Sequence, residues 1–212
     1  MYNLIIVIPC YNEKNISNLI RKLKDYAIII VDDGSKTNIK DIINENNKIK
    51  IIRNKVNRGY EYSLVKGLKA AAKNYYKYVL TMDADGEHLK SNIEKSYNYV
   101  KKNKIDLLIG SRSRFNRFSE KVLSLLFSLK YKIKDPLSGF KIYKIDSLRK
   151  IINKNKFKED FLIDLIRVFI DKKLKVRNYD IKSSKKPRRP SSMSNIKTQF
   201  KILSLLKYLL KI

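Results

Sequence analysis

Short apolar runs alternate with longer amphipathic stretches through the first half of the chain. The runs predict buried strands at residues 4–8, 28–31, 50–53, 78–81 and 106–109. Between them, apolar positions recur at helical spacing over residues 16–26, 39–46, 62–72 and 93–102. Strands that alternate with helices in this way indicate βαβ units and a mostly parallel sheet. We therefore expect an α/β, Rossmann-like layered domain that binds ligands at the carboxyl ends of its strands.

The second half of the chain is less regular. Apolar spacing predicts helices at 122–133 and 161–170, and strands at 139–143 and 175–181. A polar, basic loop follows at 183–195, and residues 196–212 have the pattern of an amphipathic helix. We expect one domain over residues 1–182, followed by this loop and this C-terminal helix.

The composition limits the class of protein. A chain of 212 residues with 43% hydrophobic content can bury a real core and is not expected to be disordered. Its one cysteine, Cys10, excludes a disulfide framework and is expected to be a small buried residue rather than a nucleophile. The N-terminus lacks a signal-peptide pattern, and no apolar run reaches the ~18 residues of a spanning helix. These features predict a cytoplasmic protein.

The charge is strongly positive. Lys and Arg number 48 against 20 Asp and Glu, a formal net charge of +28. Such a surplus is typical of proteins with a polyanionic partner, which could be nucleic acid, an anionic membrane or a phosphorylated substrate. A general compositional drift toward Lys would produce the same charge without any selected patch. The charge alone therefore leaves the partner open.

Acidic residues follow three of the predicted strands, and these strand ends should meet at one edge of the sheet. Asp83 and Asp85 leave the 78–81 strand one residue apart, so both carboxylates can reach one hard divalent cation. The expected cofactor is Mg²⁺ or Mn²⁺, with Glu87 as a third or water-mediated ligand. A solvated acidic turn is the alternative for an isolated Asp-x-Asp pair, but the strand before it favours the metal.

The other two strand ends offer groups that suit a nucleotide. Asp33, in the segment 32–35, could accept hydrogen bonds from a ribose or a base, and Gly34 permits a tight turn. A helix N-cap is the structural alternative for this segment. Tyr11 and Glu13, which follow the first strand, could meet the face and the polar edge of a base.

Seven segments carry a family pattern in order along the chain. They are Ile8-Pro9-Cys10-Tyr11-Asn12-Glu13, Val31-Asp32-Asp33-Gly34-Ser35, Asn57-Arg58-Gly59, Asp83-Ala84-Asp85-Gly86-Glu87-His88, Gly110-Ser111-Arg112, Asp135-Pro136-Leu137-Ser138-Gly139-Phe140 and the basic loop from Arg189 to Ser194. Each is weak alone, but together they resemble glycosyltransferase family 2, the inverting GT-A type. Within it, the set is similar to the polyprenyl-phosphate sugar synthases, such as dolichyl-phosphate mannosyl- and glucosyltransferases.

The resemblance implies a GT-A fold and a role for each matching residue. The donor nucleotide would contact Pro9, Tyr11, Glu13, Asp33, Lys66, Asp83 and Ala84. The metal would be held by Asp83, Asp85 and Glu87. Acceptor and phosphate groups would contact Arg112, Ser138, Gly139, Arg188, Arg189 and Ser194. Catalysis would fall to Asp85, Arg112 and Asp135.

The implied reaction moves a mannose- or glucose-like sugar from a GDP- or UDP-sugar to a polyprenyl phosphate at the cytoplasmic membrane face. A lipid phosphate is already an anionic nucleophile and needs no general base. The alternative acceptor, a glycan or other hydroxyl, would need a carboxylate base such as Asp135 or Asp164. A basic nucleic-acid-binding module is a further alternative, but no motif supports it.

Three segments depart from the family pattern. The run Tyr60-Glu61-Tyr62-Ser63 stands where relatives carry small residues, Lys141 stands where Arg is common, and Ser191-Ser192 replaces the usual Gly. These departures concern substrate identity and loop closure more than the fold.

A lipid-linked acceptor requires contact with a membrane surface. The helix at 196–212 places Lys197, Lys201 and Lys211 on one arc opposite a broad apolar face, which fits a peripheral, interfacial helix. The stretch at 122–133, with lysines at its ends, could make a second contact. Packing of both helices on the domain is the alternative. A homo-oligomer or a separate membrane partner protein is left open.

Overall fold

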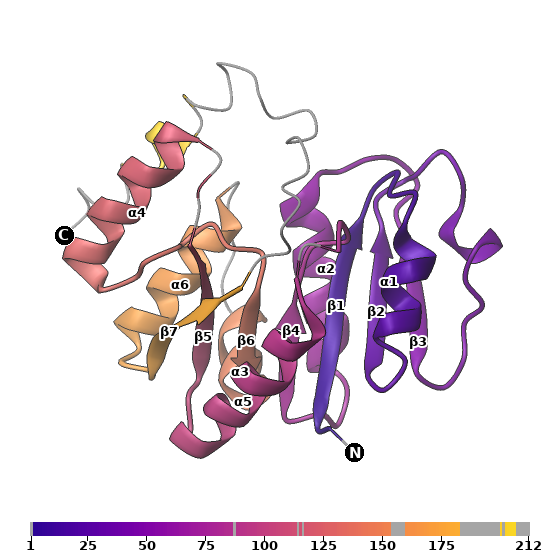
Figure 1. The fold of residues 1–212 in the computed structure, drawn as a ribbon, viewed down its shortest axis with the longest axis horizontal. Helices are drawn as coiled ribbons and strands as arrows, with labels where there is room; N and C mark the ends of the chain where they lie inside the picture. Colours follow the sequence, from indigo (N-terminus) through magenta and orange to yellow (C-terminus); the bar gives the residue numbers. More distant parts are fainter. Residues whose placement is uncertain are drawn as a thin grey trace.

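The computed structural model describes residues 2–86, 88–113, 115, 117–153, 160–182, 200 and 202–206. Seven strands form one sheet in the order β3-β2-β1-β4-β6-β5-β7 (Figure 1). Their bounds are β1 Leu4–Cys10, β2 Ala27–Asp32, β3 Ile49–Arg53, β4 Tyr78–Thr81, β5 Leu107–Arg112, β6 Lys141–Lys144 and β7 Val176–Ile181. All strands are parallel except β6, which pairs antiparallel with both β4 and β5. The α/β class and the mostly parallel sheet are confirmed.

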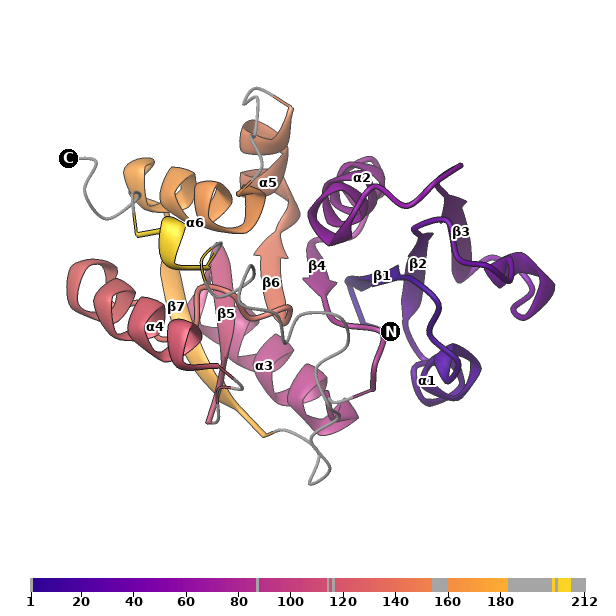
Figure 2. The same cartoon turned by 90° about the horizontal axis from the view of Figure 1, so that it is seen from above.

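Helices cover both faces of the sheet. Their bounds are α1 Ile16–Lys22, η1 Ile39–Asp41, α2 Tyr60–Ala72, α3 Lys90–Asn103, α4 Phe118–Tyr131, α5 Ile145–Ile152 and α6 Phe161–Asp171. Figure 2 shows α1 and α3 on one side of the sheet and α2, α5 and α6 on the other. Every residue of β1 is buried, because successive side chains point to opposite faces and both faces are covered.

The prediction of a helix at 39–46 is wrong. Only the single 3₁₀ turn Ile39–Asp41 forms there. The side chains that follow bond to the backbone of the next strand instead: Glu45 Oε1 accepts from the Ile51 amide at 2.7 Å, and Asn46 Oδ1 accepts from the Ile49 amide at 3.0 Å. Such side-chain bonds compete with helical hydrogen bonds and end the helix.

The strand directions bring the predicted site residues to one edge. The parallel strands β1, β2, β4 and β5 all end there, and the antiparallel strand β6 begins there. In register, Thr81 at the end of β4 lies opposite Lys141 at the start of β6. The segment just before Lys141 therefore joins the carboxyl ends of the other strands.

Part of the terminal segment packs on the domain. Ile202 and Leu205 are buried in the same core cluster as Phe169 of α6. Leu206 packs against the same cluster, whereas Phe200 is 68% exposed, and residues 196–199, 201 and 207–212 of the predicted helix lie outside the described part of the chain. No helix within the described ranges is long and apolar enough to cross a membrane.

Candidate active site

The carboxylate of Asp83, which follows β4, is held from three sides. Tyr60, the first residue of α2, donates its hydroxyl to Asp83 Oδ1 at 2.9 Å. Gly139 lies so close that a Cβ on it would collide with both carboxylate oxygens. On the third side, His88 Nε2 lies 3.7 Å from Asp83 Oδ2. Asp83 is therefore fixed in orientation, unlike a side chain of a solvated turn.

These neighbours also keep Asp83 charged. Burial works to raise the pKa of this carboxyl, but His88, the Tyr60 hydroxyl and the charge of Arg112 outweigh it, so the pKa of Asp83 lies below its usual value. His88 Nε2 is buried and has no hydrogen-bond partner among the described residues. A carboxylate that stays ionised at neutral pH suits a divalent cation, because metal ligands must be deprotonated.

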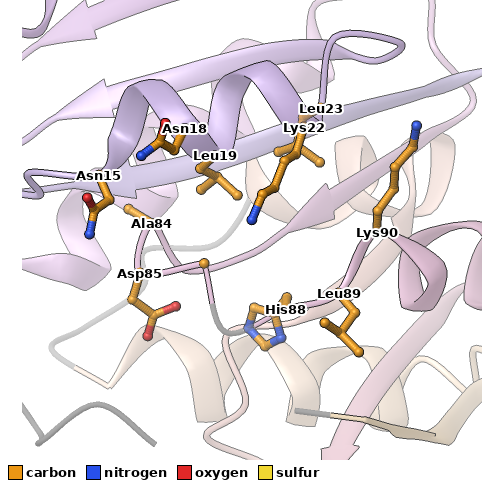
Figure 3. A pocket seen from close by; sticks show the side chains of 11 residues that line it. Asn15, Asn18, Leu19, Lys22, Leu23, Ala84, Asp85, His88, Leu89 and Lys90 are labelled. Carbon is orange, nitrogen blue, oxygen red and sulfur yellow. The ribbon is translucent and has the colours of Figure 1, made fainter. Parts of the chain in front are cut away.

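Asp85 lines a cavity of about 350 Å³. Side chains of α1 form one wall of this cavity, and the loop that contains Ala84, Asp85 and His88 forms the other (Figure 3). Of the predicted donor and metal residues in the described part of the chain, Ala84 and Asp85 belong to this lining, whereas Pro9, Tyr11, Glu13, Asp33, Lys66 and Asp83 do not. The cavity therefore covers only part of the predicted donor site.

The residues at this edge fit a divalent cation that also binds a substrate. The described part of the chain holds no cluster of three or more His, Cys, Asp or Glu side chains suited to a metal, and Glu87 lies outside it. Asp83 and Asp85 nevertheless supply two carboxylates, and Mg²⁺ commonly binds one or two carboxylates and completes its shell with phosphate and water. The cradle around Asp83, where Gly139 leaves room for the carboxylate, is consistent with such a site.

The loops after β1 and β2 are tied together beside an exposed aromatic ring. The Asn12 amide donates to Ser35 Oγ at 3.0 Å, and Asn12 Oδ1 accepts from the Lys36 amide at 2.8 Å. Asn12 adopts a left-handed conformation with φ 53°, and Tyr11 next to it is 51% exposed. The Tyr11 ring is thus presented on a braced loop, where a planar base could stack on it.

The other residues after β1 are placed differently. Pro9 and Cys10 are buried, and burial raises the pKa of the Cys10 thiol to about 12. The expectation that Cys10 is a buried small residue is confirmed. Glu13 Oε1 accepts from the Asn15 amide at 2.9 Å at the start of α1.

Asp33 anchors the loop that leads into α2. Its Oδ1 accepts from Asn54 Nδ2 at 2.8 Å and from the Arg58 amide at 2.9 Å, and its Oδ2 accepts from the Gly59 amide at 2.8 Å. Lys66 joins the same network, because its Nζ donates to Asn54 Oδ1 at 2.7 Å. The structure brings Asp33 and Lys66 together, and their contact with a nucleotide stays a prediction.

Arg112, the last residue of β5, forms a two-point ion pair with Asp135. Arg112 Nε donates to Asp135 Oδ2 at 2.8 Å and its Nη2 donates to Oδ1 at 3.1 Å, while the Arg112 amide also donates to Oδ2 at 3.2 Å. Buried Glu120 also accepts from Arg112, with Oε2 3.5 Å from Arg112 Nη2, and its Oε1 lies 2.5 Å from Arg117 Nη1. Burial works to lower the pKa of Arg112, but Asp135 and Glu120 raise it, so the guanidinium stays charged.

The turn from Asp135 to Lys141 is buried and internally bonded. Ser138 is fully buried, and its hydroxyl accepts from the Phe140 amide at 3.2 Å. The fully buried Lys141 donates its Nζ to the Ser138 carbonyl. Burial lowers the pKa of this amine to about 8, against the opposing charges of Asp135 and Asp83. The turn thereby places Gly139 against the carboxylate of Asp83.

Sequence reasoning missed how three residues are placed. Tyr60 and Lys141 were noticed only as departures from the family pattern, and His88 only as part of a motif, yet Tyr60 and His88 approach the Asp83 carboxylate and Lys141 holds the turn beside it. The predicted site residues Glu87, Arg188, Arg189 and Ser194 lie outside the described residues.

Comparison with known proteins identifies the family. The model of Glycosyl transferase family 2 matches residues 5–161, which is most of the chain. The chain belongs to glycosyl transferase family 2. It is 29% identical over 217 residues to an uncharacterized protein of Methanocaldococcus jannaschii, covering 93% of this chain and 88% of that protein. It is also 32% identical over 127 residues to the UDP-N-acetylglucosamine–dolichyl-phosphate N-acetylglucosaminyltransferase of Methanococcus voltae, covering 50% of this chain and 51% of that protein.

Solved structures share the fold of this glycosyltransferase. The glucosyl-3-phosphoglycerate synthase of Mycobacterium tuberculosis, crystallised with Mn²⁺ and UDP-glucose, superposes with a TM-score of 0.68 at 18% identity, over 96% of this chain and 78% of that chain. The resemblance stated from the motifs is confirmed at the level of family, fold and enzyme class. The relatives of this family 2 glycosyltransferase include dolichyl-phosphate sugar transferases.

Proposed function

We propose that this glycosyltransferase moves a sugar from a nucleotide-sugar donor to a polyprenyl phosphate at a membrane surface, with a divalent cation at the donor diphosphate. The observation that carries the proposal is the carboxylate of Asp83, held by Tyr60 and fitted against Gly139 two residues before Asp85, at the edge where β1, β2, β4 and β5 end. Relatives named for dolichyl-phosphate acceptors and a similar fold crystallised with Mn²⁺ and UDP-glucose support it.

In the proposed reaction, the bond between the anomeric carbon and the donor diphosphate breaks while the acceptor oxygen bonds to that carbon from the opposite face. The nucleoside diphosphate leaves, and the configuration at the carbon inverts. Asp83 and Asp85 would hold the cation, and a bound divalent ion supplies Lewis-acid stabilisation of the departing charge. Tyr11 would stack on the base, and Asp33 with Lys66 would complete the nucleoside site.

The Arg112–Asp135 pair favours a phosphate acceptor over a hydroxyl acceptor. Asp135 was the first candidate for a general base, but both of its oxygens accept hydrogen bonds from Arg112. A carboxylate bound in this way is a weak proton acceptor. A lipid phosphate brings its own anionic oxygen and needs no base, so positioning and electrostatics suffice. Asp164, in the first turn of α6, is the remaining base candidate for a hydroxyl acceptor.

A row of exposed apolar side chains on α4 suits a membrane surface. Phe118, Leu125 and Leu129, spaced seven and four residues apart on one face of α4, are 75%, 61% and 74% exposed. The exposed lysines Lys121 and Lys130 stand among them. Apolar side chains flanked by lysines match the boundary between acyl chains and anionic headgroups. We assign this row as the membrane contact that brings the active site to a lipid acceptor.

The test is a transfer assay on the purified protein. We expect Mn²⁺ or Mg²⁺, one of a panel of sugar nucleotides and a polyprenyl phosphate in vesicles to give a glycolipid. Asp85→Asn should abolish that product, while Asp171→Asn, at the exposed C-terminal end of α6, should not. Transfer to glycan hydroxyls with none to the lipid would support the alternative acceptor. No turnover with any donor, combined with salt-sensitive nucleic-acid binding, would overturn the proposal.

A further inference from the structure

The hydroxyl of Tyr60 sits at the point where two loops of the site meet. Tyr60 begins α2, and the residue before it, Gly59, has φ +92°, a conformation that favours glycine. The Gly59 amide is held by Asp33 at 2.8 Å, and the Tyr60 hydroxyl contacts Asp83 at 2.9 Å. Asp33 at the β2 end is therefore connected to Asp83 at the β4 end through the first turn of α2.

We propose that Tyr60 is a positioning residue that fixes the Asp83 carboxylate for the divalent cation. The inference rests on the proposed function, because it assumes that Asp83 is a metal ligand. The rotation of a carboxylate about its last bond is broad and soft, so a carboxylate needs partners to hold one orientation. Tyr60 engages Oδ1, and the carboxylate occupies the space that a Cβ on Gly139 would fill. The bond at Oδ1, together with the His88 ring 3.7 Å from Oδ2, sets the direction in which the carboxylate faces.

The chemistry of the phenol supports a holding role rather than proton transfer. A phenol has one proton to donate, and Tyr60 gives it to Asp83. With that proton engaged, the hydroxyl serves Asp83 as a hydrogen-bond donor. It acts on the reaction through Asp83.

Residues that hydrogen-bond to a metal ligand have measurable effects on metal binding. Removing a hydrogen-bond partner of a metal ligand typically weakens metal affinity by roughly 10- to 100-fold. Tyr60→Phe removes the hydroxyl and keeps the ring, so we expect a rise of about 10-fold or more in the dissociation constant for Mn²⁺. Saturating Mn²⁺ should restore most of the transfer rate, because the ligand itself is still present.

Tyr62 offers a matched control on the same helix. It is 46% exposed, and its ring lies under the Arg58 guanidinium at 4.8 Å. Tyr62→Phe removes an equivalent hydroxyl that does not contact Asp83, so its Mn²⁺ affinity should equal that of the wild type.

The experiment follows Mn²⁺ binding by electron paramagnetic resonance, with and without UDP, in wild type, Tyr60→Phe, Tyr62→Phe, Asp83→Asn and the double variant Tyr60→Phe/Asp83→Asn. We expect weaker binding in Tyr60→Phe alone and no additional loss in the double variant, because the hydroxyl acts only through Asp83. Unfolding curves of the same proteins separate a loss of stability from a loss of metal.

The outcomes distinguish a failure of the role proposed for Tyr60 from a failure of the proposed metal site. Unchanged Mn²⁺ affinity in Tyr60→Phe, or fully additive losses in the double variant, would overturn the role of Tyr60 while leaving the metal site standing. Wild-type protein that binds no Mn²⁺ even with UDP would refute the metal site itself, and the inference would fall with it. A lower melting temperature with wild-type affinity would show a merely structural hydroxyl.

Discussion

The buried lysine Lys141 makes the free energy of unfolding depend on pH in a direction that can be measured. Its side chain is fully buried at the start of β6, and its pKa falls from the ordinary 10.5 to about 8. That difference corresponds to a cost of about 3 kcal/mol for keeping the amine charged in the folded protein. Lys141→Met removes this cost but leaves the Ser138 carbonyl without its donor, a loss of about 1–2 kcal/mol.

The sign follows from proton binding. Because the folded pKa is lower, the unfolded chain holds more protons between about pH 8 and pH 10.5, so stability rises with pH across that window. The cost is present in full well below pH 8 and is relieved as the amine deprotonates. From the two pKa values, wild type should gain about 2 kcal/mol relative to Lys141→Met between about pH 7 and pH 9.5.

The assay is urea unfolding followed by circular dichroism at several pH values in that range. The difference between wild type and variant at each pH cancels groups that titrate in both proteins. Lys144→Met, at the other and partly exposed end of β6, is the control. Its free energy of unfolding should change with pH in the same way as that of the wild type. A difference between wild type and Lys141→Met that stays constant over this range would refute the reasoning, since a constant difference means no proton is displaced on folding.

Three further predictions follow from single contacts. Gly139→Ala should abolish metal-dependent transfer in the glycolipid assay, because the added Cβ would collide with Asp83. It should also lower the free energy of unfolding by about 1–3 kcal/mol. Full activity would contradict the contact. Arg112→Lys keeps the charge but loses the two-point fork to Asp135, so urea unfolding should show a loss of about 2 kcal/mol together with slower transfer. Leu129→Glu should reduce co-sedimentation with anionic vesicles while nucleotide binding stays unchanged, and equal sedimentation would remove α4 as the membrane contact.

The centre of the sheet could be predicted because strands such as β1 and β2 are short and buried on both faces. Runs such as residues 28–31 contain only apolar residues, and β2 extends one residue beyond that run at each end. The strand β6 was found too, but its antiparallel insertion between β4 and β5 was not, since local spacing carries no information on direction. At 39–46 the spacing favoured a helix, and the side chains of Glu45 and Asn46 decided otherwise by bonding to β3.

In the candidate site too, positions along the chain could be predicted from the sequence, whereas contacts between distant segments could not. Asp83 and Asp85 could be placed at the sheet edge from the sequence because they closely follow a strand, while their contact with a metal stays a prediction. What orients Asp83 comes from far away in sequence: Tyr60 precedes it by 23 residues, and the turn that carries Gly139 follows much later. Spacing cannot reveal a contact that exists only after β4, β6 and α2 have packed together. The signal that pointed there was the departure of Tyr60 from the small residues expected in the family, and the structure gives that departure a physical use, because a small residue at this position could not reach Asp83.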